Sequence, residues 1–477
     1  MRKIDFLKHI ESTGSWSSQT VGTFLDRIAE EEIKICIDSR KIKKGDIFLA
    51  IIGEEFDGHD YVNAAFKNGA AFCIVSKLRK YSGHCLFVDD TIEFIGKITA
   101  SYFKENKPHT LAISGSNGKT TTKEWIKTIL FSILGDSDIF VNQGNMNTEI
   151  GLPICVFNNF KNMMNKAVIE MGMSYKGDLE LLSSYFQPDY ALLTNIGSAH
   201  IGNMEESVDI LACKRELTDS IGEKGTVILN ADDPKLIRLS KEYGCKLSYF
   251  GFEENNSLTN KTVSIKTYDY SFKNGKQKTN IIAEIENEKF EINLDFFAHA
   301  GQISNLAAAI TASLLFTDRK SLVEFDYSQI KPVKNRFEFH ENRGNYLIDD
   351  FYNSSIESYK VALTMLDKLR QKDILRDFSF VIGSIAETGI YKREVHETLA
   401  KIIKQYNPGK VFIYSKNQDI KIICDYFPDA FVSDEKNILA DKIKRHLYDA
   451  EKEAVVFKAS RSVEMEDVYE IVDDFSD

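Results

Sequence analysis

The residues with the clearest chemical potential lie in the stretch 111–125, whose sequence is LAISGSNGKTTTKEW. An apolar run that ends at Gly115 predicts a buried strand, and the apolar spacing after Lys119 predicts a helix. The turn between them points backbone N–H groups and the positive end of the helix dipole at one place, which favours an anion there. Gly115 and Gly118 let the backbone approach that anion, and Lys119, expected to face solvent, can reach terminal phosphates. Thr120 adds a hydroxyl for Mg²⁺, so the stretch predicts a nucleotide site.

This loop departs from the general phosphate-loop pattern G-x-x-x-x-G-K-[ST], because Ile113 stands where the first glycine would be. A shorter form remains, with two residues between Gly115 and Gly118. A glycine turn before a helix that carries one exposed lysine is the alternative interpretation. The predicted strand before the loop and the predicted helix after it favour the nucleotide site.

Two more polar residues follow predicted strands of the same region. Glu170 ends an apolar run, and His200 follows another. Because the carboxyl ends of parallel strands meet near such a loop, the carboxylate and the imidazole could hold Mg²⁺ beside phosphates. Taken singly, the glutamate is as easily a solvated charge and the histidine a structural residue. Lys214 lies in a predicted helix, where an exposed basic face is the default interpretation.

Composition places the chain among ordinary globular proteins. Its 477 residues suggest about three domains, and 43% of them are hydrophobic and 27% charged. The net charge of −11 argues against a nucleic-acid or anionic-membrane partner. Phosphorylated ligands must therefore be met by local positive charge and backbone dipoles.

Cysteine usage and the N-terminus indicate a reducing, cytoplasmic location. The seven cysteines are odd in number and scattered without a C-x-x-C spacing, so neither a disulfide framework nor a zinc site is expected. The N-terminus lacks the apolar core of a signal peptide, and no run approaches the ~18 apolar residues of a membrane span. We expect neither export nor membrane insertion.

Alternating strand and helix signals divide the chain into three α/β domains, at 1–106, 107–325 and 326–477. The first domain has no phosphate loop, and its polar clusters are typical of turns. The central domain is expected to hold a parallel sheet with right-handed crossovers and ligands at the carboxyl ends of its strands. Residues 262–294 differ, because alternating β-type runs flank a hairpin signal there. They predict an antiparallel appendage.

These motifs, taken in order, resemble those of the Mur ligases of peptidoglycan synthesis. The resemblance covers nearly the whole chain. In the C-terminal domain the string IDDFYN at 348–353 is similar to that of the branch that adds a D-alanyl-D-alanine dipeptide. The other matching strings are DSR (38–40), GDIFLA (45–50), G-x-x-x-DGH (53–59), GSNGKTTTKE (115–124), GNMNTEIGLP (144–153), EMG (170–172), NIG-x-AH (195–200) and NADDP (230–234).

The resemblance implies a fold and a reaction. The fold would comprise an α/β N-terminal domain that binds the UDP-MurNAc-peptide, a central P-loop ATPase domain and a Rossmann-like C-terminal domain. ATP would phosphorylate the C-terminal carboxylate of the UDP-MurNAc-tripeptide, and the D-Ala-D-Ala amine would attack the acyl phosphate to give an amide, ADP and phosphate. The partners would be these small molecules alone, and the enzyme would be a monomer.

The resemblance also assigns roles to single residues. Lys214 would carry a carbamate, which turns a cation into an anion able to bind metal. Arg336 comes from another domain than Lys119, so the site would be complete only when the domains close. The implied catalytic residues are Lys119, Glu170, His200, Lys214 and Arg336, with Thr120, Glu170, His200 and Lys214 at Mg²⁺. The implied ATP contacts are Gly115, Ser116, Asn117, Gly118, Lys119, Thr120, Thr121, Asn305, Arg336 and Asp350, and the substrate contacts are Ser39, Arg40, Asn145, Asn147, Tyr352 and Asn353.

The chain departs from the family pattern at several positions. Gly301-Gln302 stands where the family has histidine-asparagine, with His299 two residues earlier, and Asn335 stands where glycine is usual. Ser384 and Ala459 are further departures in the C-terminal domain. They affect the acceptor side of the site and leave the nucleotide and metal positions intact.

Two other functions remain possible at this point. One is a related ligase that adds a different group, such as a diamino acid or the glutamate of folates, although the strings at 38–40 and 348–353 argue against it. The other is a nucleotide-operated binding protein without amide synthesis. ATP hydrolysis that requires both a carboxylate and an amine substrate would distinguish a ligase from such a switch.

Overall fold

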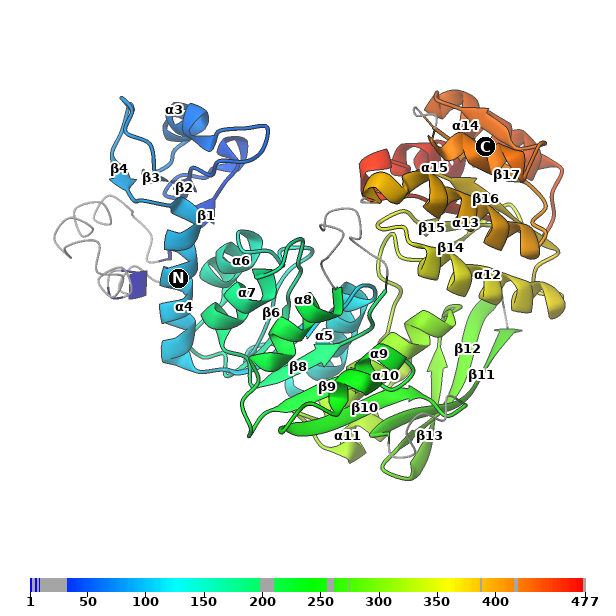
Figure 1. The fold of residues 1–477 in the computed structure, drawn as a ribbon, viewed down its shortest axis with the longest axis horizontal. Helices are drawn as coiled ribbons and strands as arrows, with labels where there is room; N and C mark the ends of the chain where they lie inside the picture. The colour runs from blue at the N-terminus through cyan, green and yellow to red at the C-terminus, as the bar shows by residue number, and fades with distance from the viewer. Residues whose placement is uncertain are drawn as a thin grey trace.

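The computed structural model describes residues 1, 5, 6, 8, 32–197, 210–254, 261–273, 275–386, 388–415 and 419–474. These residues form three sheets, of four, nine and six strands, each with its own helices. Figure 1 shows the N-terminal sheet and the C-terminal domain at opposite ends of the central domain. The α/β class predicted for the three domains is confirmed. No helix in these ranges is long and apolar enough to cross a bilayer.

The N-terminal sheet is parallel, and its polar motifs form turns. Asp38 accepts a hydrogen bond from the backbone N–H of Arg40, and Asp57 accepts one from that of His59, so each caps a short 3₁₀ helix. The strands are β1 (Ile35–Cys36), β2 (Ile47–Leu49), β3 (Phe72–Val75) and β4 (Cys85–Phe87), and the helices are η1 (Ser39–Lys41), η2 (Gly58–Tyr61), α3 (Val62–Lys67) and α4 (Thr91–Asn106).

The central sheet places one strand at a point where the strand order reverses. Its spatial order is β6 (Ile139–Val141), β7 (Lys166–Glu170), β5 (His109–Ser114), β8 (Tyr190–Leu193), β9 (Thr226–Asn230), β10 (Lys246–Phe252), β11 (Val263–Lys273), β12 (Lys276–Ile285) and β13 (Glu288–Leu294). Strands β6 to β11 in this order run parallel. Because β5 lies between β7 and β8, its carboxyl end opens into the crevice where such sheets bind ligands.

The antiparallel strands predicted at 262–294 are present, since β12 pairs antiparallel with both β11 and β13, but they extend the central sheet and do not stand apart from it. Strand β11 pairs in parallel with β10, with Phe250 opposite Val263, so β11, β12 and β13 continue the central sheet. The physical reason is that their alternate apolar residues need a partner surface. They share one core with helices α5 (Lys119–Leu134) and α10 (Ala300–Ser313).

The remaining central helices cover the sheet, and the C-terminal domain repeats the α/β pattern. Helices α6 (Gly151–Asn159), α7 (Asp178–Phe186), α8 (Ile210–Asp219), α9 (Pro234–Ser240) and α11 (Arg319–Val323) belong to the central domain, with η4 (Tyr327–Gln329) after them. The C-terminal sheet has the order β14 (Glu338–Asn342), β15 (Asn345–Asp350), β19 (Glu453–Lys458), β16 (Asp377–Ile382), β17 (Val411–Tyr414) and β18 (Phe431–Ser433), in which only β14 is antiparallel to its neighbour. Its helices are α12 (Ile356–Gln371), η5 (Gly389–Tyr391), α13 (Lys392–Gln405), η6 (Asp419–Asp425), α14 (Lys436–Tyr448), η7 (Arg461–Val463) and α15 (Glu466–Asp473).

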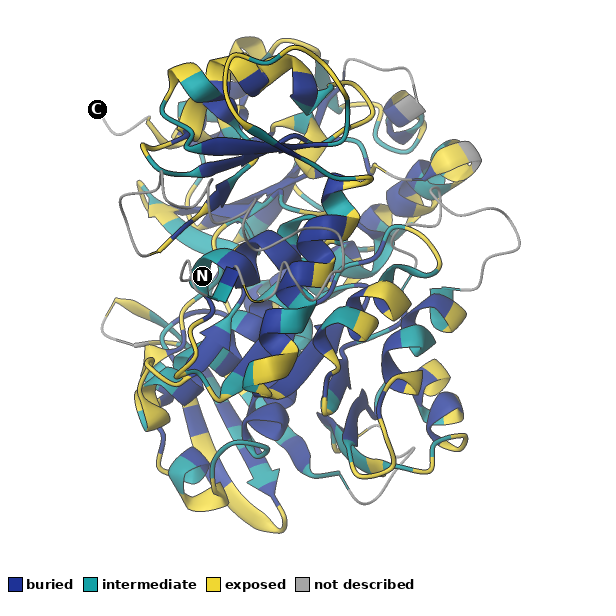
Figure 2. Ribbon diagram, turned by 90° about the vertical axis from the view of Figure 1, so that its left-hand side faces the viewer, coloured by how far each residue is buried: buried dark blue, intermediate teal, exposed yellow. Residues whose placement is uncertain are grey.

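The buried residues concentrate in the strands and the inner faces of the helices, as Figure 2 shows. The hairpin β11–β12 also touches the C-terminal domain, through a contact that we call the hairpin contact. In it Lys372 Nζ lies 2.6 Å from Asp269 Oδ1, and Lys368 Nζ donates to Tyr268 Oη at 2.9 Å. The Tyr270 side chain is buried in the C-terminal core. The central sheet therefore supports the C-terminal domain directly.

Candidate active site

The phosphate loop lies between β5 and α5 and needs glycine at two positions. Gly115 has φ of 144° and Gly118 has φ of 83°, a backbone region that residues with a Cβ rarely adopt. A Cβ at Gly115 would lie 1.9 Å from Thr194 Oγ1, and one at Gly118 would lie 2.2 Å from Asn305 Oδ1. The loop is thus packed closely between the segment after β8 and helix α10.

The segment after β8 fixes the loop backbone. Asn195 makes two hydrogen bonds to the loop. Its carbonyl accepts from Ser116 N at 3.0 Å, and its Oδ1 accepts from Asn117 N at 2.9 Å. The N–H of Gly197 donates to Ser116 Oγ at 2.9 Å. These contacts hold the loop open toward the start of α5, whose first N–H groups have no partner within the helix. Sequence reasoning noted Asn195 only as part of a motif.

The Lys119 side chain is half-buried and engaged with the loop, whereas it was expected to face solvent freely. Its Nζ donates to the carbonyl of Gly115 at 2.7 Å and lies 3.4 Å from that of Ser116. The ammonium therefore bridges the loop that it belongs to. An anion that enters the loop offers this ammonium stronger, charge-assisted hydrogen bonds than the two carbonyls do.

Glu170, at the end of β7, accepts hydrogen bonds from two polar side chains beside the start of α5. Its Oε1 accepts from Thr120 Oγ1 at 3.1 Å and from Asn147 Nδ2 at 2.7 Å. Arg336 of the C-terminal domain donates from Nη2 to Thr120 Oγ1 at 3.1 Å. The structure thus brings together predicted site residues from two domains, and Arg336 already reaches the loop.

A buried lysine that sequence reasoning missed, Lys123, supports this group. Lys123 Nζ donates to the carbonyls of Asn142 at 2.7 Å and Gly144 at 3.0 Å and lies 3.7 Å from Glu170 Oε2. Its side chain is fully buried. The sequence signal was its position four residues after Lys119, on the same helical face. Lys123 joins α5 to the loop that carries Asn147.

Lys214, on α8, is buried, with 1% of the residue exposed. The default interpretation of an exposed basic face is therefore wrong. Burial lowers the pKa of Lys214 well below its usual value, and the nearby charge of Lys119 lowers it further. No hydrogen bond or ion pair holds its Nζ within the described ranges. The predicted partner His200 lies outside the described residues.

A cavity of about 600 Å³ separates the phosphate loop from the C-terminal domain. Among the predicted nucleotide contacts it is lined by Asn117, Gly118, Thr121, Asn305, Arg336 and Asp350, and Tyr352 and Asn353 also line it. The carboxylate of Asp350 is paired with the buried Lys458 ammonium. This pairing opposes the effect of burial, which raises the pKa of Asp350. The cavity is large enough for a nucleotide-sized ligand.

Two of the departures from the family pattern have structural reasons. Burial lowers the pKa of His299 to about 3, so the neutral ring can accept from Gln302 N at 3.1 Å. The Gln302 side chain accepts in return from His299 N at 3.0 Å, which closes a capping box at the start of α10. Asn335 has φ of 63°, a conformation that glycine adopts freely and that asparagine tolerates better than most residues. For Ser384 and Ala459 the structure offers no explanation.

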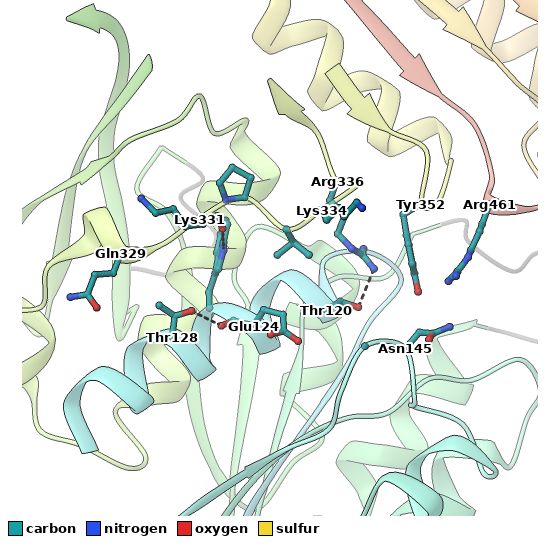
Figure 3. A pocket seen from close by; sticks show the side chains of 14 residues that line it. Thr120, Glu124, Thr128, Asn145, Gln329, Lys331, Lys334, Arg336, Tyr352 and Arg461 are labelled. Carbon is teal, nitrogen blue, oxygen red and sulfur yellow. Dashed lines mark hydrogen bonds between the residues drawn. The ribbon is translucent and has the colours of Figure 1, made fainter. Parts of the chain in front are cut away.

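A second pocket, of about 470 Å³, adjoins Thr120 and is shown in Figure 3. The ring of Tyr352 lies between two guanidinium groups, with Arg336 at 4.0 Å and Arg461 at 5.4 Å from the ring centroid. Asn145 points in from the opposite side. The lining residues Lys331 and Lys334 add further positive charge, and Arg461 has no carboxylate partner in the described part of the chain. Sequence reasoning missed Arg461 as a site residue.

The remaining predicted substrate residues lie apart from both cavities. Ser39 is buried at the start of η1 in the N-terminal domain. Arg40 is exposed, with its Nε 2.9 Å from Asp38 Oδ1. Neither lines the two cavities described above.

Comparison with known proteins decides the family. The description "Mur ligase family, catalytic domain" matches residues 34–111, and "Mur ligase middle domain" matches residues 113–313. The chain belongs to the Mur ligase family. It is therefore an ATP-dependent ligase that forms a carbon–nitrogen bond.

Relatives match this Mur ligase over almost its full length. The UDP-N-acetylmuramoyl-tripeptide–D-alanyl-D-alanine ligase of Bacillus subtilis is 29% identical over 453 residues, covering 91% of this chain and 92% of its own. The protein of that name from Escherichia coli is 25% identical over 439 residues, covering 91% and 92%. The MurF ligase of Thermotoga maritima, solved in complex with ADP, has a TM-score of 0.77 and 26% identity, covering 92% and 97%.

Proposed function

We propose that this Mur ligase adds D-Ala-D-Ala to a UDP-MurNAc-tripeptide, a step of peptidoglycan synthesis. The observation that carries the proposal is the collinear similarity to ligases of that name over about nine tenths of both chains. The string at 348–353, which includes Asp350, Tyr352 and Asn353, lines both cavities and supports it. The seven cysteines are free, in keeping with a cytoplasmic location, and one chain supplies both sides of the site, in keeping with a monomer.

In the reaction a carboxylate must be converted into an electrophile by phosphorylation. The cationic residues at the loop can supply the positive charge that this phosphoryl transfer requires. A substrate carboxylate and the γ-phosphate repel each other unless cations lie between them. Lys119 and Arg336 would neutralise the charge on the transferring phosphoryl group, and the walls of the closed site would keep water from the acyl phosphate. The dipeptide amine would then attack the acyl carbon, and phosphate would leave as the amide forms.

The donor set at the loop fits Mg²⁺. Glu170 Oε2 is buried and accepts no hydrogen bond within the described residues, and its neighbour Lys123 Nζ, at 3.7 Å, is beyond hydrogen-bond distance. Oxygen donors such as this carboxylate and the Thr120 hydroxyl are those that Mg²⁺ prefers. We propose Thr120 and Glu170 as ligands, with His200 and Lys214 at a second ion. When bound, Mg²⁺ would screen the phosphate charge and orient the γ-phosphate.

The environment of Lys214 also fits a carbamate. A carbamate forms from a neutral amine and CO₂, and burial keeps this amine neutral at a lower pH than usual. A buried ammonium without a partner would in addition weaken metal binding nearby by repulsion. We propose that Lys214 carries a carbamate and that Ser39 and Arg40 contact the UDP-linked substrate.

The test of the overall function is phosphate release from ATP by the purified enzyme. We expect release only when the UDP-MurNAc-tripeptide and D-Ala-D-Ala are both present. Release with the dipeptide form of the precursor and a diamino acid, or with a folate and glutamate, would instead indicate a related ligase. Release from ATP alone would indicate the nucleotide-operated switch.

Replacing Arg336 by alanine should lower kcat far more than it weakens ATP binding. Its guanidinium is held over Tyr352 and against Thr120, where the transferring phosphoryl group gains charge. Steady-state kinetics and calorimetric titration with a non-hydrolysable ATP analogue give the two quantities. Equal losses in affinity and in kcat/KM, with kcat unchanged, would contradict a transition-state role.

Replacing Arg461 by alanine should raise KM for D-Ala-D-Ala alone. Its guanidinium faces the second pocket without a carboxylate partner, so it is suited to the free carboxylate of the incoming dipeptide. We expect an increase of about 10-fold or more, with KM for ATP and for the UDP-linked substrate unchanged. D-Ala-D-alaninamide, which lacks the carboxylate, should be a poor substrate of the parent and no poorer for Arg461→Ala. If Arg461→Ala lost as much activity toward D-Ala-D-alaninamide as toward D-Ala-D-Ala, Arg461 would not be the group that binds the dipeptide carboxylate.

A further inference from the structure

Arg336 lies at the tip of a turn whose backbone is strained on both sides. Asn335 has φ of 63° and Phe337 has φ of 64°, in the left-handed region that residues other than glycine rarely adopt. Such a conformation persists only where surrounding contacts hold it. The direction in which Arg336 points therefore depends on whatever fixes the two flanking residues.

One residue of β15, Asp349, fixes both flanks. Its Oδ2 accepts from Asn335 N at 3.3 Å, and its Oδ1 accepts from Glu338 N at 3.0 Å. Its backbone carbonyl accepts from Phe337 N at 2.7 Å. The residue is 4% exposed, so water does not compete freely for these contacts. Asp349 thus receives three N–H groups from the two sides of Arg336.

Successive side chains of a strand point to opposite faces, which explains the pair of aspartates. Asp350 lines the nucleotide cavity, whereas Asp349 points to the turn that carries Arg336. His340 Nε2 lies 3.4 Å from Asp349 Oδ2 and 3.7 Å from Glu338 Oε2, and the neighbouring Asp349 carboxylate raises the pKa of this imidazole. These three side chains are close enough to hold a cation. Both oxygens of Asp349 are, however, already engaged by backbone N–H groups.

We propose that Asp349 is a positioning residue, which holds the strained turn so that the Arg336 guanidinium enters the phosphate site. The proposal rests on the role of Arg336 in the proposed function. The turn is anchored on the other side as well, because Gln302 Nε2 donates to the Arg336 carbonyl at 3.2 Å. Without the Asp349 carboxylate, the flanks lose two of their three N–H acceptors and Arg336 can swing away from Thr120.

The test compares Asp349→Ala and Arg336→Ala with the double variant in the full enzyme. We expect Asp349→Ala to lower kcat by about 10- to 100-fold, as a misplaced catalytic group does, with KM for ATP changed much less. The double variant should lose no more kcat than Arg336→Ala alone, because Asp349 acts through that arginine. Asn335→Gly should restore part of the kcat of Asp349→Ala, since glycine adopts the required φ without strain.

Asp318→Ala is the matched control, because Asp318 also accepts a backbone N–H, from Ser321 at 2.9 Å, but lies outside the site. Its kcat should equal that of the parent. If Asp349→Ala fails to fold, Asp349→Asn, which keeps one acceptor oxygen, replaces it in the same cycle. A parent-like kcat for the Asp349 variant, or losses that multiply in the double variant, would overturn the proposal. A harmless Arg336→Ala would instead overturn the role proposed for the arginine.

Discussion

Lys119→Ala should reduce turnover by about 10³-fold or more, the largest loss that we expect from a single substitution. In the structure the Lys119 ammonium bridges the Gly115 and Ser116 carbonyls across the phosphate loop. When phosphates enter the loop, the same ammonium can turn to them and balance the charge that builds up during transfer. Phosphate release under saturating substrates measures the effect.

Stability should change little in this variant. The two carbonyls can bind water when the ammonium is absent, so the loss is about that of one exposed hydrogen bond, on the order of 1 kcal/mol. Thermal unfolding of the variant checks this. Lys127→Ala, on the same helix but with 43% of its side chain exposed, is the matched control and should keep parental turnover. If the turnover of Lys119→Ala stayed within tenfold of that of the parent, the assignment of this loop as the nucleotide site would be wrong.

Lys214→Ala should be nearly inactive, with a loss of about 100-fold or more, the upper end for groups that orient a metal site. A neutral buried amine gains CO₂ and loses a proton, so that a nitrogen–carbon bond forms and an anion replaces a potential cation. Removal of the side chain also leaves room for a small anion. We therefore expect added bicarbonate or acetate to restore part of the turnover of Lys214→Ala.

Lys214→Arg should not be rescued, because arginine keeps the positive charge and fills the space. Lys224→Ala, which removes an exposed lysine beyond the end of α8, should behave as the parent. A readout independent of turnover is intact mass under gentle conditions, or the carbon-13 signal of a carbamate after incubation with labelled bicarbonate. A fully active Lys214→Ala together with an unmodified parent lysine would remove the carbamate from the mechanism.

Local sequence patterns predicted the nucleotide loop because its requirements are local. The strand, the two glycines and the helix that begins at Lys119 are adjacent in the chain, and each has its own signal in the sequence. The boundary residues of β5 and α5 could be placed closely for the same reason. By contrast, the sequence of β10, KLSYFGF, mixes polar and apolar residues, and most of these residues are only partly buried. The sequence analysis therefore did not predict this strand. Without it, the hairpin could not be seen as part of the central sheet.

Properties that depend on distant contacts were not predictable. Lys214 and Lys123 have ordinary helical settings in the sequence, and only the packing of α8 and α5 against the sheet buries them. The same kind of error occurred at Lys119, which was expected to face solvent but contacts the loop carbonyls, an arrangement that requires the turn geometry of Gly115. Family resemblance supplied roles for single residues. The hydrogen bond between Arg336 and Thr120, and the hydrogen bonds by which Asp349 fixes the turn that carries Arg336, could be found only in the structure.

The hairpin contact between the central sheet and the C-terminal domain bears on how often Arg336 meets the phosphate loop. A domain tied only by one linker would sample a large volume, and its arginine would be present at the loop at roughly millimolar effective concentration. The ion pair of Lys372 with Asp269 and the buried Tyr270 give the domain a second attachment to the central sheet, which restricts the volume that the domain can sample. Arg336 therefore already lies at the loop that ATP would enter, and the entropic cost of bringing the two domains together is met when the chain folds.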